Sequence, residues 1–401
     1  MFIDPRRSTL ALLALAISAF AIGTTEFISV GLLPLIAEDL NISVTTAGLT
    51  VTLYALGVTF GAPVITSLTS AVSRKTLLMA LMILFIAGNS LAAAADGIAV
   101  LLSARVVSAL SHGLFMSIAS TIAADLVPEN RRAGAISIMF TGLTVATVTG
   151  VPLGTFLGQQ LGWRAAFMAI VITGIIALLA NMTLVPSGLR KGVRTPLREQ
   201  IKLVTHGRLL LAFAITALGY GGTFVVFTYL SPLLHEISGF KEQTVAVILL
   251  IYGVAIAIGN AIGGKAANRK PMNALFYMFA LQTVILLVLT FTAPFRLAAL
   301  ITVFFMGLLA FMNVPGLQTY VVMLAERYAP NARDIASAVN IAAFNAGIAI
   351  GAYLGGMVTD SLGLIHTAWV GSIMVLGAVL LTAWSRTLER KDEAALQTKA
   401  A

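Results

Sequence analysis

The sequence predicts an all-α membrane protein with twelve transmembrane helices arranged as two repeats of six. Three observations lead to this fold class. Of the 401 residues, 59% are hydrophobic and only 10% are charged, against ~25% charged residues in an ordinary soluble domain. The apolar residues form runs long enough to cross a bilayer, and motifs of the first half of the chain return in the second. A single water-soluble globule is excluded, because too little polar surface exists to cover it.

Twelve apolar stretches approach or exceed the ~20 residues that a transmembrane helix needs. In chain order they are 9–36, 44–70, 75–95, 98–125, 133–158, 163–186, 208–234, 243–264, 271–293, 297–325, 334–358 and 364–386. The linkers are mostly short, except for one polar and basic stretch in the middle. This stretch divides the chain into an N-terminal six-helix bundle (1–186), a linker (187–207), a C-terminal six-helix bundle (208–388) and a tail (389–401).

The distribution of Lys and Arg predicts the side of the membrane that each linker faces, because cytoplasmic loops carry an excess of these residues. Of the 25 Lys and Arg residues, 21 fall on one side, three (Arg164, Lys241 and Arg296) fall on the other, and Arg105 lies inside a span. Both termini, the central linker and the tail are therefore predicted to be cytoplasmic. The net charge of +9 then reflects topology, and we expect no nucleic-acid partner.

The two halves resemble each other at a constant spacing. Four matched positions share an offset of 198 residues: Pro34 with Pro232, Glu38 with Glu236, Tyr54 with Tyr252, and Gly61 with Gly259. Parallel six-helix repeats are typical of transporters in which the substrate path lies between the two halves.

Ionisable residues inside the spans are informative, because a charge at the bilayer centre costs ~2.5–3.5 kcal/mol even on lenient insertion scales. Glu26 is the only acidic residue deep in a span, Arg105 the only basic one, and His112 the only histidine. Glu26 and Arg105 are predicted at similar depths, and His112 lies two helical turns from Arg105 on the same face. We interpret Glu26, Arg105 and His112 as a proton-coupling group; static packing of Glu26 and Arg105, and a neutral hydrogen-bonded His112, are the alternatives.

The second half carries neutral polar and aromatic residues in its spans and no acid. The candidate substrate-binding residues are Tyr220, Tyr229, Asn313, Gln318, Asn340 and Asn345. This distribution suggests that one half handles the proton and the other contacts the substrate. Some of these side chains are also expected merely to tie helices together.

Several kinds of chemistry are not indicated. The chain has no cysteine, which excludes disulfides and thiolate metal sites, and we expect no metal and no cofactor. The run from Gly259 to Lys265 fits the phosphate-loop spacing, but Ala266 follows where Ser or Thr is needed, and no strand precedes it. A polytopic membrane enzyme is a weaker hypothesis, because acids and histidines do not gather at one membrane face.

Motifs spread over the first half resemble one known family. They are Gly23-Thr-Thr-Glu26-Phe and Gly31-Leu-Leu-Pro34 in the first span, Arg105-Val-Val-Ser-Ala-Leu-Ser-His112-Gly113 in the fourth, Gly150-Val-Pro152-Leu-Gly154 in the fifth, and Gly162-Trp163-Arg164 before the sixth. They are similar to motifs of the twelve-span drug:proton antiporter family of the major facilitator superfamily. The first-span motif resembles the bacterial sugar- and arabinose-efflux branch of that family.

This resemblance implies a monomeric secondary transporter in the bacterial inner membrane that exports a sugar, a nucleoside or a drug-like compound by proton antiport. A proton-coupled uptake symporter of the same fold is the main alternative. In relatives, the loop after the second span forms a charge latch. Here Arg74 and Lys75 remain while its aspartate and glycines are missing, and Arg269 lies in the second-half copy.

Small residues four positions apart form flat stripes on four spans, which lets backbones approach closely. The residues of this motif are Gly57, Gly61, Gly150, Pro152, Gly154, Gly259, Gly263, Gly351 and Gly355. Static packing is one interpretation. The resemblance favours the other, a sliding seam between the halves during alternating access, because spans 2 and 11 and spans 5 and 8 meet in major facilitators.

Overall fold

The computed structural model is all-helical in the part of the chain that it describes, residues 5–69, 72–128, 132–186, 205–267, 271–328 and 333–400. Among these residues, twelve helices are long and apolar enough to cross a membrane, which confirms the predicted fold class. The predicted linker lies largely in residues 187–204, outside the described ranges, and so does Arg269.

Contacts divide the chain into two compact units. Unit 1 comprises Met1–Arg194 and Thr228–Gly253, and unit 2 comprises Thr195–Phe227 and Val254–Ala401. The first six spans are formed by α1 (Pro5–Asp39), α2 (Val44–Thr69), α3 (Arg74–Ala93), α4 (Ile98–Asp125), α5 (Arg132–Val145) with the π-helix η2 (Ala146–Gly150) and α6 (Val151–Leu161), and α7 (Trp163–Leu184).

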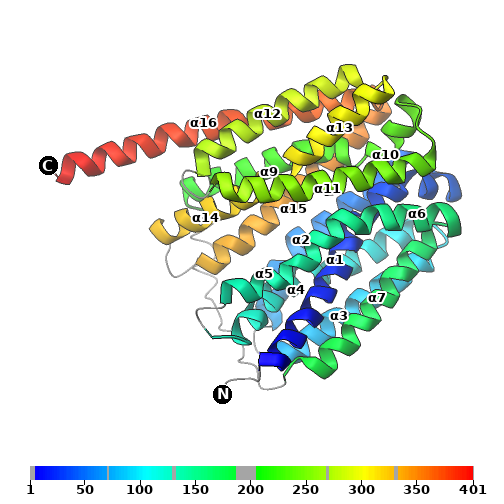
Figure 1. Ribbon diagram of the computed structural model, residues 1–401, viewed down its shortest axis with the longest axis horizontal. Coiled ribbons are helices and arrows are strands. Elements are labelled where there is room, and N and C mark those ends of the chain that lie inside the picture. The colour runs from blue at the N-terminus through cyan, green and yellow to red at the C-terminus, as the bar shows by residue number, and fades with distance from the viewer. Residues whose placement is uncertain are drawn as a thin grey trace. The chain divides into compact units, whose positions relative to one another are not determined.

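The next spans begin with α9 (Gly207–Phe227), which is followed by the short α10 (Leu230–Pro232) and the π-helix η3 (Leu233–Ile237). They continue with α11 (Glu242–Ala267), α12 (Pro271–Thr292), α13 (Arg296–Ala310) with α14 (Val314–Tyr328), α15 (Arg333–Ser361) and α16 (His366–Ala400). Within unit 2, α16 packs along α12 and continues past it towards the C-terminus (Figure 1).

Two predicted spans are interrupted by a turn, and a third contains a π-helical turn within a continuous helix; each of these irregularities lies just before a proline. Pro152 follows the π-helix η2, Pro232 follows the break after α9, and Pro315 follows the break between α13 and α14. Proline has no backbone N–H to donate to the carbonyl group four residues earlier. Apolar run lengths do not reveal such local irregularities, so the sequence predicted a regular helix at all three places. Pro34, the repeat counterpart of Pro232, lies inside the unbroken α1.

Glycine contacts follow the repeat. A Cβ placed on Gly61 would lie 2.7 Å from Leu110 Cδ2, and one on Gly259 would meet the backbone carbonyl group of Leu308. Both residues of the second pair are 198 positions after those of the first. The same offset therefore relates α4 to α13, and it places Val303 at the position of Arg105.

Candidate functional site

Arg105 on α4 is fully buried, and three backbone carbonyl groups hold its guanidinium group. Nε donates to Thr50 O at 3.2 Å, Nη1 to Thr25 O at 2.8 Å, and Nη2 to Glu26 O at 3.3 Å. These bonds tie α4 to both α1 and α2. A buried cation needs such partners, because removing it from water without them is costly.

Glu26 lies in the same layer as Arg105, as the sequence predicted, but the two side chains are not ion-paired. Arg105 contacts the backbone oxygen of Glu26, and no hydrogen bond or ion pair to the Glu26 carboxyl group occurs among the described residues. The Glu26 side chain is half-buried. This carboxyl group is therefore free to change its protonation state without breaking a bond to Arg105.

Tyr54 on α2 connects Arg105 to His112, and sequence reasoning did not assign it to the site. The guanidinium carbon of Arg105 lies 4.1 Å from the centre of the Tyr54 ring, a cation–π contact. The Tyr54 hydroxyl group lies 3.2 Å from Nδ1 of His112, which is also buried. Glu26, Arg105, Tyr54 and His112 thus form one cluster inside unit 1, which we call the charged cluster. The sequence marks Tyr54 only as the repeat counterpart of Tyr252, and no sequence pattern links it to Arg105.

The loop after α2 forms an ion pair although its motif is degenerate. Arg74 Nη1 lies 2.5 Å from Asp125 Oδ2 at the end of α4, and both side chains are largely buried. Lys75 Nζ donates to the backbone oxygen atoms of Met182 and Val185 at 2.9 and 2.5 Å, at the end of α7. The two basic residues therefore join α3 to α4 and α7.

The glycine stripes of the first six spans contact helices of the same unit. A Cβ on Gly57 would lie 2.7 Å from Ala109 Cβ on α4, and one on Gly150 would lie 2.6 Å from Thr24 Oγ1 on α1. Gly154 faces Ile28 of α1 in the same way, and Pro152 is buried at the start of α6. Such contacts within one unit are what the static packing interpretation of the glycine stripes predicts.

The glycine stripes of unit 2 also contact residues of their own unit. Gly263 lies against the backbone of Met312, and Gly351 against the backbone of Gly221 on α9. Gly355 on α15 is buried. One contact between spans 5 and 8 does occur within unit 1, where a Cβ on Gly253 would lie 2.7 Å from Val148 O in the π-helix η2.

The candidate substrate-binding residues are divided between the two units. Tyr229 belongs to unit 1, where its ring lies so close to Gly48 that a Cβ there would be 2.8 Å from Tyr229 Cζ. Tyr220 lies in unit 2 among aromatic rings. Asn340 accepts from Thr216 at 2.8 Å and donates to Gln318 at 2.8 Å, so this amide pair ties helices α9, α14 and α15.

Asn313 and Asn345 are buried and keep one unused polar atom each. Nδ2 of Asn313 donates to Gln282 Oε1 at 3.2 Å, and Nδ2 of Asn345 donates to its own helix at Ile341 O at 3.1 Å. The Oδ1 atoms of both asparagines accept no hydrogen bond from the described residues. Gln282 also donates to Thr223.

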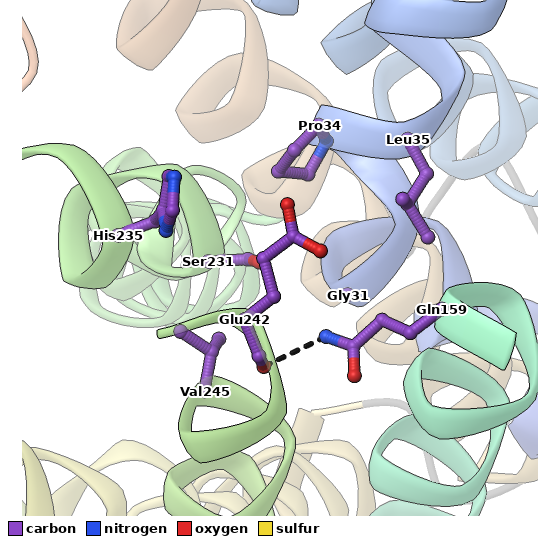
Figure 2. A pocket seen from close by; sticks show the side chains of 8 residues that line it. All are labelled: Gly31, Pro34, Leu35, Gln159, Ser231, His235, Glu242 and Val245. Atoms are coloured by element: carbon purple, nitrogen blue, oxygen red, sulfur yellow. Dashed lines mark hydrogen bonds between the residues drawn. The ribbon is translucent and has the colours of Figure 1, made fainter. Parts of the chain in front are cut away.

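A small pocket lies in unit 1 at the ends of α1 and α6, beside η3 and the start of α11. Figure 2 shows Gln159 donating to the backbone oxygen of Glu242, at 2.7 Å, while the Glu242 carboxylate is directed towards Pro34. His235 and Ser231 complete the polar lining. Sequence reasoning did not assign Gln159, Ser231, His235 or Glu242 to a site, since each lies at a span end where polar residues are ordinary. Among the described residues no group of three or more acidic, His or Cys side chains could hold a metal ion.

A twelve-span bundle of two repeats, with one charged cluster buried in its first half, defines a membrane transporter of the major facilitator type. The Major Facilitator Superfamily profile matches residues 15–327. The chain belongs to this superfamily of transporters, and it is not an enzyme.

Relatives extend over nearly the whole chain. It is 73% identical over 382 residues to YtbD of Bacillus subtilis, an uncharacterized MFS-type transporter, with 95% of this chain and 96% of the relative covered. It is 39% identical over 371 residues to YdhP of Escherichia coli, an inner membrane transport protein, with 92% and 94% covered. A chloramphenicol resistance protein of Streptomyces lividans is 33% identical over 386 residues, with 94% and 97% covered.

Among solved structures, an inward-facing, occupied bacterial homologue of the human lysosomal transporter Spinster has the same fold. The TM-score is 0.76 at 16% identity, and 96% of this chain and 98% of that chain are covered. The chain is a multi-pass membrane protein. It is located in the inner membrane, as the sequence predicted and as its Escherichia coli relative YdhP is.

Proposed function

We propose that this transporter exports a small molecule by proton antiport with alternating access, and that Glu26 carries the proton. The observation that carries the proposal is the state of the Glu26 carboxyl group, which lies beside a buried cation without a bond to it. A permanently satisfied structural acid would be hydrogen-bonded instead, as buried polar groups generally are.

The position of the Arg105 guanidinium group does not change in the proposed mechanism. Its bonds go to backbone carbonyl groups, which accept hydrogen bonds whether Glu26 is charged or neutral. The cation therefore remains in place as the proton binds and leaves. His112 and Tyr54 supply a second route by which a proton can approach the same layer.

The aromatic and amide groups of unit 2 support a role in substrate binding. Tyr220, Asn313 and Asn345 are the residues that we assign to it, because the Gln318–Asn340 pair is occupied with joining helices. Tyr229 packs on Gly48 of α2, and we assign it to packing within unit 1. The glycine contact between Gly253 and η2 is where we place the sliding seam of spans 5 and 8.

The direction of transport and the substrate are part of the proposal. The glycine and proline motif of span 5 resembles that of antiporters, which favours export. The Streptomyces relative is named for chloramphenicol resistance, and the sequence motifs resemble a sugar-efflux branch. Chloramphenicol and arabinose are therefore the two probes to test first.

Everted membrane vesicles test the proposal directly. With an acidic interior, an antiporter accumulates its substrate inside, whereas an uptake symporter of the same fold releases it. We expect Glu26→Gln to abolish pH-driven accumulation, because an amide cannot bind or release the proton. Glu38→Gln, at the exposed end of the same helix, is the matched control. Uphill accumulation by Glu26→Gln with wild-type pH dependence would show that Glu26 is structural.

A further inference from the structure

Near the end of its span, α16 carries an arginine that has no anionic partner among the described residues. The guanidinium carbon of Arg386 lies 4.7 Å from the centre of the Phe276 ring on α12, a cation–π contact within unit 2. Arg386 makes no hydrogen bond or ion pair in the described part of the chain, and its Nε is buried in that state. Its two Nη groups are not buried. The guanidinium group therefore packs against a ring on one side and presents N–H donors to the surroundings of the protein on the other.

The nearest acid in this part of α16 is directed elsewhere. Glu389 follows Arg386 by three residues, but its carboxyl group lies at the hydroxyl group of Tyr320 on α14. Arg390 is one helical turn beyond Arg386 and shares its face. Arg390 is exposed, and the described residues give it no hydrogen bond or ion pair. Two positive charges on one face of α16 are thus not neutralised by the described residues.

The position of Arg386 along its helix corresponds to the level of lipid headgroups. Twenty residues separate it from His366, the first residue of α16. At 1.5 Å per residue this distance is ~30 Å, the thickness of the hydrocarbon core of a bilayer. Two large aromatic side chains nearby are mostly exposed, Trp384 on α16 and Tyr277 on α12, at 55% and 62%. Trp and Tyr are enriched at the membrane–water interface.

Other basic residues at the helix ends have partners within the protein. Arg74 is paired with Asp125, and Lys75 donates to two backbone oxygen atoms at the end of α7. Arg208, at the start of α9, donates to Ser385 O at 3.4 Å. These residues join helices to one another. Arg386 and Arg390 make no such bond, so their charges are available to an anion from outside the chain.

We propose that Arg386 and Arg390 bind the phosphate group of an anionic phospholipid at the lipid-facing surface of α12 and α16. The planar donors of arginine match phosphate oxygen atoms. The lipid carries a net negative charge, because the ammonium group of a zwitterionic lipid would be repelled by the two guanidinium groups. A lipid is favoured over free phosphate because Tyr277 and Trp384 are exposed where an acyl chain would lie. This inference goes beyond the proposed transport function and does not depend on it.

Native mass spectrometry of the purified full chain tests the inference by measuring the affinity for individual lipids. The probes are phosphatidylglycerol, which has a net negative charge, and phosphatidylcholine with the same acyl chains, which has none. We expect phosphatidylglycerol to bind at least about fivefold more tightly, the factor that ~1 kcal/mol for a basic residue near anionic lipid gives. Inorganic phosphate in excess should not displace the bound lipid.

A charge-matched variant separates a specific site from general attraction. Arg386→Gln should weaken phosphatidylglycerol binding about fivefold, and Arg386→Gln with Arg390→Gln roughly 25-fold. The control is Arg327→Gln, which removes the same charge from the exposed end of α14, where the guanidinium group lies over Tyr328. It should leave the affinity within about twofold of the wild type, because salt screens a charge that does not touch the lipid.

Melting temperatures keep binding apart from folding. A ligand that binds only the folded protein raises its melting temperature. Phosphatidylglycerol added to the detergent should therefore stabilise the wild type and Arg327→Gln, and stabilise the double variant much less. Because each variant is compared with itself with and without lipid, a change in its lipid-free stability does not affect the result.

The inference is overturned if phosphatidylcholine binds as tightly as phosphatidylglycerol, or if Arg386→Gln keeps the wild-type affinity. An equal loss in Arg327→Gln would show a general attraction of basic ends to anionic lipid, with no site at Arg386. Displacement by inorganic phosphate would show a site for the free anion. No gradient is applied, so a failure of proton coupling in vesicles leaves this result unaffected.

Discussion

The guanidinium group of Arg105 donates to the backbone carbonyl oxygen of Glu26, at 3.3 Å, and not to its carboxylate. Its other donors go to the carbonyl oxygen atoms of Thr25 and Thr50. Arg105 is therefore held by the backbone of two neighbouring helices. Among the described residues, no hydrogen bond or ion pair reaches the carboxyl group of Glu26 beside it.

The carbonyl contacts predict that Arg105→Lys is not a conservative change. An ammonium group carries the charge, but it cannot reproduce a planar fork that reaches two helices. Losing one charge-assisted hydrogen bond should lower the free energy of unfolding by about 1.5–3 kcal/mol, seen as a lower melting temperature in detergent. Arg164→Lys is the control, because its partly exposed ion pair with Asp39 belongs to a class worth ~0–1 kcal/mol. Equal losses in both variants would contradict the prediction.

Tyr54 should be needed for its ring more than for its hydroxyl group. Tyr54→Phe keeps the ring beneath Arg105 and loses the contact with His112, so we expect a loss of about 1 kcal/mol in stability and continued transport. Tyr54→Leu also removes a buried cation–π contact worth about 2 kcal/mol, and transport should fail. The repeat supplies the control, Tyr252→Leu. If Tyr54→Phe is as inactive as Tyr54→Leu, the hydroxyl group matters more than the ring.

Gly154 distinguishes the two interpretations of the glycine stripes. Gly154 faces Ile28 of α1 in the same unit. Gly154→Leu should therefore lower the free energy of unfolding by about 1–3 kcal/mol, as overpacking typically does. The melting temperature and transport should fall together. A sliding seam predicts a different result, lost transport at unchanged stability. Gly97→Ala is the control, because nothing lies within 4 Å of a Cβ at that position.

The Arg74–Asp125 ion pair should stabilise the protein although the loop after α2 lacks the aspartate and glycines of the family motif. Arg74→Ala and Asp125→Ala each remove one partner of a short, largely buried ion pair. A double-mutant cycle should give a coupling of about 1 kcal/mol in unfolding free energy, at the upper end for surface pairs because of the burial. Additive losses in the double variant would show that the two residues do not stabilise each other.

The positive charges predict the orientation of the chain in the membrane. A reporter protein fused after Ala401 should be active only in the form that folds in the cytoplasm, because 21 of the 25 Lys and Arg residues lie on the side of both termini. A fusion at the loop that contains Lys241 is the control and should behave in the opposite way. Activity of the C-terminal fusion outside the cell would reverse the assigned orientation.

The sequence predicts the spans and the shared layer of Glu26 and Arg105 well, because run length and helical rise determine both. It does not predict the partners of Arg105. Carbonyl groups carry no sequence signal, and the pairing of α4 with α1 and α2 is a tertiary property. Tyr54 was missed for that reason. The π-helical turn before Pro152 and the breaks before Pro232 and Pro315 could have been expected from the missing N–H groups, but Pro34 shows that a proline alone does not decide the outcome.

The offset of 198 residues has an evolutionary consequence. If the chain arose by duplication of a six-helix ancestor, the copies diverged at Glu26 and Phe224, and at Arg105 and Val303, while they kept the glycine contacts that hold each copy together. One copy has ionisable groups at these positions, and the other has an aromatic ring and a branched aliphatic side chain. If Glu26 carries the proton as proposed, new cargo can be acquired in such a lineage by changes in the second copy alone, with the residues of the first copy inherited intact.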